Sequence, residues 1–419
     1  MRILMLTQWF EPEPALKGLL FARALQARGH QIEVLTGFPN YPEGRVYPGY
    51  RIRPFQREVI DGIQVVRVPL FPSHDASPVR RILNYVSFTA SAVLLGSFLT
   101  RRADVIYAYH PPLTVGVAAS MLGLVKRAPF VYDVQDLWPD TLAATGMMSG
   151  RLPLRLVDLV AKWVYRRAAH VAAQSPGFES KLAERGVPPS KLSVIYNWTH
   201  EEGTRVGPNS QIAADLEIGT KFNVIFAGTM GRAQGLDAVL QAAKLVDRPG
   251  SRIQFILIGG GIETGHLKAE TKRLGLSNVR FFSRVPMSEI GAVLAAGDVL
   301  LVHLRDDPLF EITIPAKTQA YLSSGKPILI GVKGDAAELI ARSGGGVSCE
   351  PEDPQSIANA VTRLEAMNPS ELRAMGERGK AFYWSELSLE IGTLHFLRIF
   401  DRVISDFHTA PGPPGRWRL

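Results

Sequence analysis

The stretch FEITIPAKTQAYLSSGKPILIG, from Phe310 to Gly331, decides the fold of the second half of the chain. A strand-like run, VLLVHL, precedes it, and within it an apolar-periodic helix start leads to Gly-Lys-Pro and another strand-like run. In an open α/β sheet, ligands bind outside the carboxyl ends of the strands, where helix N-termini present unpaired N–H groups to anions. The stretch therefore predicts an anion-binding crevice that suits a nucleotide-sized ligand.

The alternation of strand and helix runs through both halves of the chain. The first half opens with a strand at 3–7, a helix at 19–30 and a strand at 31–37, and the second half restarts the pattern with KFNVIFAGTMGRAQGLDAVLQAAKL. This predicts an α/β fold with two doubly wound parallel sheets. A chain of 419 residues also exceeds the roughly 250–300 residues at which a single core stops growing. The expected domains are residues 1–200 with a C-terminal helix at about 384–405, a linker at 201–220, and residues 221–383.

The amino-acid composition limits the kinds of binding partner that we expect. The net charge of +8 and the pI near 9.5 predict attraction to nucleic acid, to an acidic membrane surface or to phosphorylated small molecules, without choosing among them. The first loop carries Gly18 but no G-x-G-x-x-G, which weakens a dehydrogenase interpretation. The single cysteine, Cys349, excludes a disulfide framework. The opening MRILMLTQWF turns polar too early for a signal peptide, so we expect a protein that is not exported.

An uncharged run at 82–99 lies between the pairs Arg80-Arg81 and Arg101-Arg102. Three structures are open for it: a buried core helix, a helix in the membrane interface with its arginines on headgroups, or a transmembrane span. The strand-like ADVIYAYHPP that follows needs a crossover helix before it, which argues against the span. A basic amphipathic helix at 152–170 is either a domain face or a second membrane-surface element.

Polar side chains follow successive strands in both halves. His110, Gln135, Asp136 and Asp140 are expected at one crevice of the first sheet, where a carboxylate such as Asp136 can accept hydrogen bonds from sugar hydroxyls. A histidine in such a place is more often structural. In the second sheet, Arg232 and Lys317 follow strands in equivalent positions, so that both cations could reach one diphosphate.

Eight segments, in this order and spacing, resemble one enzyme family over nearly the full chain. They are QWFEPEP with ARALQARGHQIEVLTGFPNYPEG, YHPPLTVG, YDVQDLWPDT, SPGF with VIYNW, FAGTMGRAQGLDA and PAKTQAYLSSGKPI. The chain is similar to retaining glycosyltransferase family four, within its WbuB-like bacterial polysaccharide sub-group. The resemblance implies the GT-B fold, in which two Rossmann-like domains face each other across a cleft. It also implies that the C-terminal domain binds the nucleoside diphosphate and that the N-terminal domain faces the acceptor.

The resemblance assigns roles to individual residues. Arg232 and Lys317 would neutralise the charge that builds on the leaving diphosphate, and the protein would position the reactants on one face of the sugar without a dedicated nucleophile. The implied catalytic residues are Arg232, Lys317 and Asp136; the donor-binding residues are Gly18, Lys17, Gly228, Gly231, Gln234, Glu311 and Gln319; the acceptor-side residues are His110, Gln135, Trp138 and Asp140. No metal and no cofactor beyond the substrate nucleotide sugar is expected.

The chain departs from the family pattern at the ribose contact. The family places two glutamates eight residues apart, and the corresponding positions hold Ile312 and Ala320. Glu311 and Gln319 are eight apart but one residue earlier, a rotation of about 100° on a helix. The family lysine of the second-domain turn is replaced by Gln234, which increases the expected importance of Lys317, and Gln135-Asp136 stand where many members have a histidine.

We therefore expect a cytoplasmic enzyme, peripherally associated with the inner face of the cell membrane. It would transfer a sugar from a UDP-sugar to a lipid-diphosphate-linked or saccharide acceptor in surface polysaccharide synthesis. It would contact an anionic membrane surface through residues 80–102 and would not bind nucleic acid. Two rivals remain: a UDP-sugar 2-epimerase of the same fold, and an inactive nucleotide-sugar-binding subunit.

Overall fold

The computed structural model describes residues 1–73, 77–144, 147–148, 150–204, 212 and 221–409. The chain forms two compact units, one of Met1–Tyr196 with Gly392–Leu419 and one of Asn197–Ile391. They are called unit 1 and unit 2 below. Most of the predicted linker at 201–220 lies outside the described residues.

Unit 1 contains an eight-stranded sheet in the order β3-β4-β2-β1-β5-β6-β7-β8. The strands are β1 (Arg2–Leu6), β2 (Gln31–Gly37), β3 (Gln56–Ile60), β4 (Ile63–Val68), β5 (Val105–Tyr109), β6 (Phe130–Val134), β7 (His170–Ala173) and β8 (Leu192–Val194). The pairs are parallel except for the hairpin of β3 and β4. In the centre, β1 lies between β2 and β5, with Met5 opposite Val34 and Tyr107.

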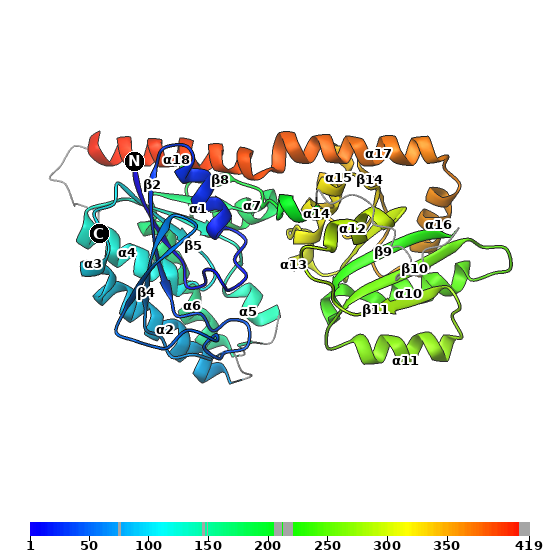
Figure 1. Cartoon of the computed structure of the whole chain (residues 1–419), viewed down its shortest axis with the longest axis horizontal. Coiled ribbons are helices and arrows are strands. Elements are labelled where there is room, and N and C mark those ends of the chain that lie inside the picture. Colours follow the sequence, from blue (N-terminus) through cyan, green and yellow to red (C-terminus); the bar gives the residue numbers. More distant parts are fainter. Residues whose placement is uncertain (74–76, 145–146, 149, 205–211, 213–220, 410–419) are drawn as a thin grey trace. The chain divides into compact units, whose positions relative to one another are not determined.

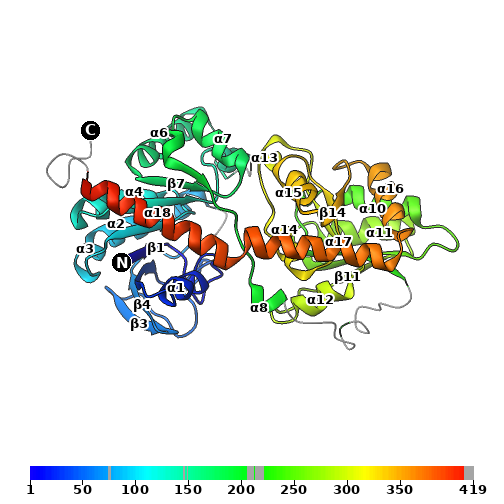
Figure 2. The same ribbon diagram turned by 90° about the horizontal axis from the view of Figure 1, so that it is seen from above.

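Helices cover both faces of this sheet (Figures 1 and 2). They are α1 (Leu19–Gln26), α2 (Pro78–Leu94), α3 (Gly96–Leu99), α4 (Thr114–Lys126), α5 (Asp140–Ala144), α6 (Arg151–Arg167), α7 (Pro176–Glu184), a 3₁₀ turn at Pro189–Lys191, and α18 (Leu389–Thr409). On one face, the ring of Phe396 in α18 lies 5.2 Å from the rings of Phe21 in α1 and Tyr107 in β5. Figure 1 shows α2, α3 and α4 on the side of the sheet away from α18.

The uncharged run at 82–99 forms most of α2 and all of α3. Tyr85, Phe88 and Ala92 of α2 are buried, whereas Leu83 and Val86 are exposed. The helix is therefore a crossover helix with one face in the core and the other face outside. Among the described residues, no helix is long and apolar enough to cross a lipid bilayer.

Unit 2 contains a six-stranded parallel sheet in the order β11-β10-β9-β12-β13-β14. The strands are β9 (Phe222–Thr229), β10 (Ile253–Gly260), β11 (Val279–Phe282), β12 (Val299–His303), β13 (Ile328–Gly331) and β14 (Gly346–Ser348). Val299–Val302 of β12 and Ile328–Ile330 of β13 are continuous runs of buried apolar residues, as expected of parallel strands that are covered on both faces.

The helices of unit 2 connect these strands in sequence order. They are α8 (Glu201–Thr204), a 3₁₀ turn at Arg232–Gln234, α10 (Leu236–Val246), α11 (Thr264–Leu274), α12 (Ile290–Ala296), α13 (Pro308–Glu311), α14 (Ala316–Ser324), α15 (Asp335–Ser343), α16 (Pro354–Glu365), α17 (Pro369–Phe382) and a π-helical turn at Tyr383–Leu387. The predicted fold class, two doubly wound parallel sheets, is confirmed. The loops after β1, β5 and β6 in unit 1, and after β9, β12 and β13 in unit 2, therefore lie at the carboxyl edges where ligands bind.

Candidate functional site

Lys317 is in the first turn of α14, at the carboxyl edge of the unit 2 sheet. Its Nζ atom lies 3.4 Å from the centre of the Phe226 ring on β9. The side chain as a whole is partly exposed, but Nζ is buried and has no hydrogen-bond partner among the described residues. Burial lowers the pKa of this ammonium to about 7. A buried cation without a counter-ion is poorly stabilised by the protein alone. A bound anion would supply the missing negative charge.

Tyr321 holds the lysine in this position. It follows Lys317 by four residues and so lies on the same face of α14. Its hydroxyl donates to the carbonyl of Ala227 at 3.1 Å and accepts from the Ala227 N–H at 2.9 Å, which attaches α14 to the end of β9. The next residue, Gly228, leaves room for the lysine, because a Cβ there would lie 3.2 Å from the Lys317 Nζ.

Hydrogen bonds within unit 2 hold the turn after β9 in place. The N–H of Gly231 donates to the side-chain oxygen of Gln234 at 2.9 Å, and the carbonyl of Gln234 accepts from Nδ1 of His303 at 2.7 Å. Nε2 of His303 in turn accepts the N–H of Glu352 at 3.2 Å. These partners fix His303 as a neutral ring with its proton on Nδ1, and burial lowers its pKa. Gln234 and Gly231 thus shape the turn within the protein.

Arg232 projects from this turn into a different environment from that of Lys317. Its side chain is 82% exposed, and its Nε lies 3.3 Å from a carboxylate oxygen of Glu263. It lines a cavity of about 340 Å³ beside the start of α10, and Arg305 and Glu352 also line this cavity. Arg305 and Glu352 are themselves paired at 3.3 Å. Arg232 and Lys317 therefore flank the same strand end, one outside and one beneath the surface.

The two polar residues predicted on the ribose side are placed differently. Glu311 ends α13 with an exposed side chain, and its carbonyl would lie 2.0 Å from a Cβ at Gly334, so its backbone is packed tightly against the start of α15. Gln319 is 1% exposed, and in the amide orientation that satisfies both side-chain atoms its nitrogen donates to the carbonyl oxygens of Pro315 at 2.9 Å and Ala316 at 3.2 Å. Gln319 is thus satisfied within its own helix.

Lys17 in unit 1 is fully buried. Its Nζ lies 2.7 Å from the carboxylate of Asp133 in β6, and both side chains have no exposed surface. Asp133 also accepts from Tyr107 and Gln135, each at 2.6 Å. Burial lowers the pKa of Lys17, and the negative charge of Asp133 opposes that shift. Phe396 of α18 packs 5.1 Å from the ammonium. The lysine predicted to bind the donor therefore joins β6, the first loop and α18 in the core.

Gly18 directly precedes α1, and a carboxylate already lies at this helix N-terminus. Glu11 accepts the N–H of Leu19 at 2.9 Å, and a Cβ at Gly18 would lie within 2.8 Å of both Glu11 oxygens. Burial raises the pKa of Glu11. Gly18 is therefore required by the close approach of Glu11, a residue that the sequence analysis did not single out.

Asp136 lies at the carboxyl edge of unit 1 among aromatic rings. Burial raises its pKa to about 6. Burial also raises the pKa values of Tyr41 and Tyr85, and the charge of Asp136 adds to both shifts, which places it close to these hydroxyls. Tyr41 stacks on Trp9 with centroids 4.3 Å apart, and Tyr85 lies 6.0 Å from Trp138. Asp136 thus lies near two tyrosine hydroxyls whose rings pack against Trp9 and Trp138, and a carboxylate near flat aromatic faces suits a sugar ring.

His110 contacts the backbone of the loop that carries Asp136. Its Nδ1 accepts the backbone N–H of Asp136 at 3.2 Å, and burial lowers its pKa to about 3, so the ring is neutral. It is 1% exposed and packs edge-on against Tyr132 and Trp138. These contacts give His110 a role in positioning the loop that carries Asp136.

The remaining predicted acceptor-side residues have partners inside unit 1. Gln135 donates to Asp133, and its carbonyl accepts from Gln174 at 2.7 Å. Asp140 pairs with Arg185, which also donates to the carbonyl of Trp138 at 2.7 Å. The structure thus brings Trp138 and Asp136 together and places Asp140 in a supporting ion pair.

The loop after β1 contributes a second buried carboxylate that the sequence analysis missed. Glu13 is 1% exposed and accepts the N–H groups of Phe10, Asn40 and Tyr41 at 3.2, 2.7 and 2.7 Å. Burial raises its pKa to about 7, against the effect of these hydrogen bonds. Glu13 thereby joins the loops after β1 and β2 and orients Tyr41. The available signal was the acidic QWFEPEP directly after a strand.

Two family models match the chain. The model of the glycosyl transferase 4-like domain matches residues 19–198, and that of glycosyl transferases group 1 matches residues 221–366. Together they span most of both units.

Curated relatives and solved structures agree with this. The chain is 27% identical to a probable glycosyltransferase, WbjE, of Pseudomonas aeruginosa, over 65% of this chain and 68% of that protein. It is 25% identical to the putative colanic acid biosynthesis glycosyl transferase WcaI of Escherichia coli, over 80% and 84%. Its fold is shared with HepE of Anabaena in complex with UDP and glucose (TM-score 0.68, 19% identity, 96% and 99% covered) and with sucrose-phosphate synthase of Thermosynechococcus elongatus (0.70, 16%, 96% and 99%).

Proposed function

Since the chain belongs to the family-four glycosyltransferases of GT-B fold, we propose that it transfers a sugar from a UDP-sugar with retention of configuration. The acceptor is a lipid-diphosphate-linked or saccharide intermediate of surface polysaccharide synthesis. The choice of UDP is supported by the HepE complexes with UDP and UDP-glucose. The choice of pathway is supported by the colanic acid assignment of WcaI.

The observation that carries the proposal is the ammonium of Lys317. It is buried without a hydrogen-bond partner among the described residues, at the carboxyl end of β9 and beside Gly228. A diphosphate at this edge would pair with it, and the exposed Arg232 would approach from the cavity side. Both cations would stabilise the negative charge that develops as the diphosphate leaves. The proposal therefore assigns charge neutralisation to side chains and not to a metal ion.

In the proposed reaction, the acceptor oxygen forms a bond to the anomeric carbon while the bond from that carbon to the diphosphate oxygen breaks. The acceptor proton passes to an oxygen of the leaving diphosphate on the same face of the sugar. No protein nucleophile is needed, and positioning supplies most of the catalysis. The acceptor sugar would lie against Trp9, Tyr41 and Trp138, with its hydroxyls on the carboxylate of Asp136.

We also propose that the enzyme works at the cytoplasmic face of the membrane, through residues 80–102. A lipid-diphosphate acceptor presents its sugar at the bilayer surface, so an enzyme that binds there meets it at high local concentration. The exposed apolar side chains of α2 and the arginine pairs on either side of residues 82–99 support this location.

The test measures release of nucleoside diphosphate. Full-length protein would be incubated with UDP-glucose, UDP-galactose, UDP-N-acetylglucosamine and GDP-mannose, with and without a polyprenyl-diphosphate-linked monosaccharide. We expect acceptor-dependent release of UDP. Lys317→Ala should lower turnover about 10- to 100-fold, since a hydrogen bond to a charged group contributes roughly 1.5–3 kcal/mol. Lys268→Ala is the matched control, because Lys268 also lies over an aromatic ring but is exposed on α11.

Each rival gives a different result. A UDP-sugar 2-epimerase would convert the donor into its epimer without net acceptor-dependent release of UDP. An inactive subunit would bind UDP without turnover of any donor. Wild-type activity in Lys317→Ala would refute the diphosphate assignment.

A further inference from the structure

The outer face of α2 and α3 carries apolar side chains in a helical stripe. Val79, Leu83 and Val86 are spaced i, i+4 and i+7, and all three are exposed. Phe98 on α3 continues this surface and is 89% exposed. None of these side chains belongs to the buried face of α2. The stripe therefore contributes little to the stability of unit 1 and needs another explanation.

The same pattern recurs on α6. Leu152, Leu156 and Leu159 are again spaced i, i+4 and i+7 and are exposed, Leu152 by 70%. The buried residues of this helix are Ala161, Val164 and Tyr165. On α4, between the two, Leu124 and Val125 are exposed at the last turn.

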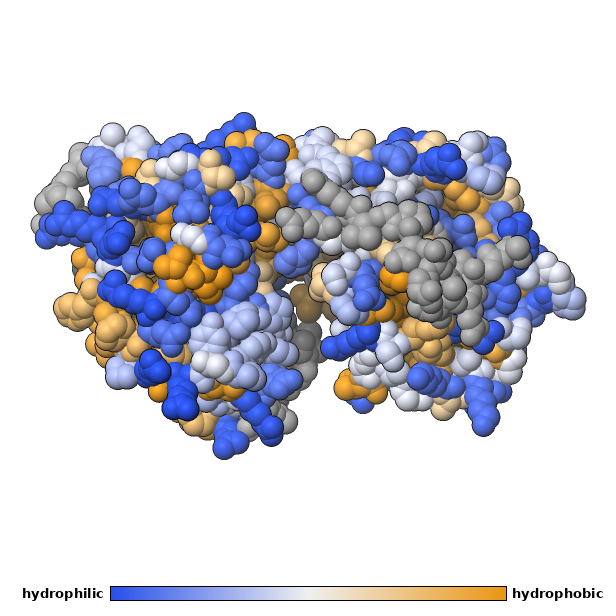
Figure 3. All heavy atoms as spheres, viewed as in Figure 1, coloured by the Kyte–Doolittle hydropathy of each residue, from blue (hydrophilic) through white to orange (hydrophobic). Residues whose placement is uncertain are grey.

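These helices lie side by side in one layer. The hydroxyl of Thr89 in α2 donates to the carbonyl of Thr114 in α4 at 3.2 Å. A Cβ at Gly116 of α4 would lie 2.4 Å from a methyl carbon of Val164 in α6. On the described residues of α1 and α18, in the opposite layer, Leu394 is the one exposed large apolar side chain, and at 36% it is less exposed than the residues of the stripes. Figure 3 shows apolar surface over α3 and the adjoining part of α2, bordered by hydrophilic residues.

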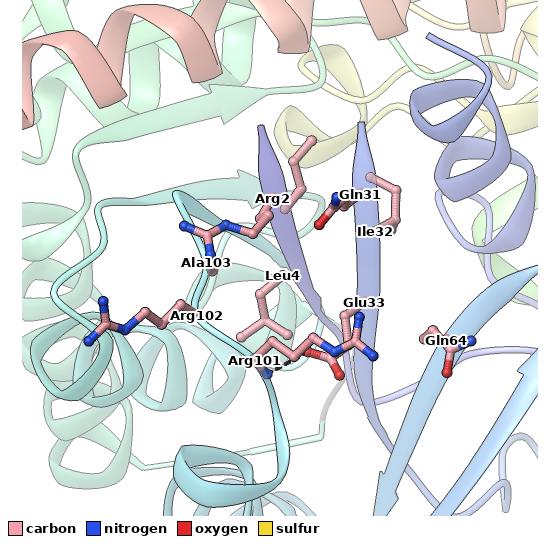
Figure 4. Close-up of a pocket in the computed structure, with 10 residues that line it drawn as sticks. Arg2, Leu4, Gln31, Ile32, Glu33, Gln64, Arg101, Arg102 and Ala103 are labelled. Carbon is pink, nitrogen blue, oxygen red and sulfur yellow. Dashed lines mark hydrogen bonds between the residues drawn. The ribbon is translucent and has the colours of Figure 1, made fainter. Parts of the chain in front are cut away.

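Basic residues occupy both ends of this layer. Residues 77–103 and 111–129 contain six arginines and lysines and no aspartate or glutamate. Arg101 and Arg102 follow α3, while Arg151 and Arg155 lie in the first two turns of α6. Figure 4 shows Arg101 and Arg102 beside a small cavity of about 40 Å³ at the amino ends of β1 and β2, with the guanidinium of Arg102 extending away from those strands. This cavity is at the opposite end of the strands from the candidate site.

We propose that the outer faces of α2, α3, α4 and α6 form one membrane-docking surface, which lies flat on a bilayer that contains anionic lipids. The apolar stripes would enter the boundary between headgroups and acyl chains, and the basic residues at the helix ends would contact lipid phosphates. Charge complementarity favours this occupant, because the layer offers cations at both ends of an apolar centre. The inference deepens the membrane contact proposed for residues 80–102 and rests on that part of the proposed function alone.

Vesicle flotation of the full-length protein tests the surface. The variant Val86→Glu/Phe98→Glu/Leu156→Glu places one carboxylate on each of α2, α3 and α6. The control Leu245→Glu/Ile262→Glu/Met287→Glu makes the same change in charge at exposed apolar residues of unit 2. We expect wild type and control to bind phosphatidylglycerol vesicles alike, more weakly at high salt. The first variant should bind at least tenfold more weakly, and an unchanged midpoint of urea unfolding would show that it is still folded.

Three outcomes would overturn the inference. One is equal vesicle binding by the two triple variants. A second is equal binding of wild type to phosphatidylcholine and phosphatidylglycerol vesicles, which would remove the role of the basic residues. A third is that wild type and the control are dimers in light scattering while the first variant is a monomer. A second copy of the chain would then cover this surface in place of a membrane. Because vesicle binding needs no sugar donor, failure of the transferase proposal would leave this test intact.

Discussion

Lys17 and Lys317 each place an ammonium group beneath the carboxyl edge of a parallel sheet, in different units. The ammonium of Lys17 lies 2.7 Å from the carboxylate of Asp133. The ammonium of Lys317 packs on the ring of Phe226 and has no hydrogen-bond partner among the described residues. A buried charge with its counter-ion belongs to the fold, whereas a buried charge without one is poised for a ligand. The comparison therefore separates a structural lysine from a candidate binding lysine.

The largest expected effect is the loss of stability when Lys17, the lysine paired with Asp133, is replaced. Lys17→Met leaves the carboxylate of Asp133 buried without its cation, and we expect the free energy of unfolding to fall by about 3–5 kcal/mol. Urea denaturation of the full-length protein measures this. Lys268→Met, at an exposed residue of α11, should change it by less than about 0.5 kcal/mol. If Lys17→Met kept its stability but lost affinity for UDP, Lys17 would contact the donor and the contrast would fail.

The next effect is the pH dependence of UDP binding. Burial holds the pKa of Lys317 at about 7 in the free protein, and a diphosphate beside it would raise that pKa. Binding then takes up a proton above pH 7, so the affinity falls by up to about tenfold per unit as pH rises. UDP adds little to this slope, because its terminal phosphate is already mostly ionised above about pH 7.

Calorimetry between pH 7 and pH 9 measures this dependence. Lys317→Arg is the comparison, because a guanidinium keeps its charge throughout this range. We expect a flat profile for the arginine variant and a falling one for wild type. Parallel profiles would show that Lys317 does not sense the ligand.

The smallest expected effect is at Arg232, which shares the strand end with Lys317 but is exposed and paired with Glu263. Arg232→Ala should weaken UDP binding by about two- to fivefold, in line with up to roughly 1 kcal/mol for an exposed ionic contact. Arg273→Ala, an exposed arginine paired with Glu270 on α11, should leave the affinity unchanged. If Arg232→Ala weakened UDP binding as much as Lys317→Ala does, the exposed Arg232 would be the main contact of the diphosphate.

From the sequence alone, Lys17 was predicted to bind the donor and Lys317 to act on its diphosphate, so both were expected beside the ligand, and the reason is physical. Both follow strand-like runs and precede helices, and periodicity reports only that local context. The counter-ion of Lys17 is Asp133, 116 residues further along the chain, and it becomes a neighbour only when β6 is placed in the sheet. Gln319 shows the same limit: its helix was predicted, but its bond to the carbonyl of Pro315 depends on how the helix begins.

The sequence by itself determined the two parallel sheets and the cations and carboxylates at their carboxyl edges. These follow from hydrophobic alternation and from residue identity, which need no contact across the chain. The tertiary structure decided which charges are paired, that Glu11 occupies the start of α1, and which face of α2 lies outside. Those properties depend on distance and burial, and they are fixed only when remote segments pack together.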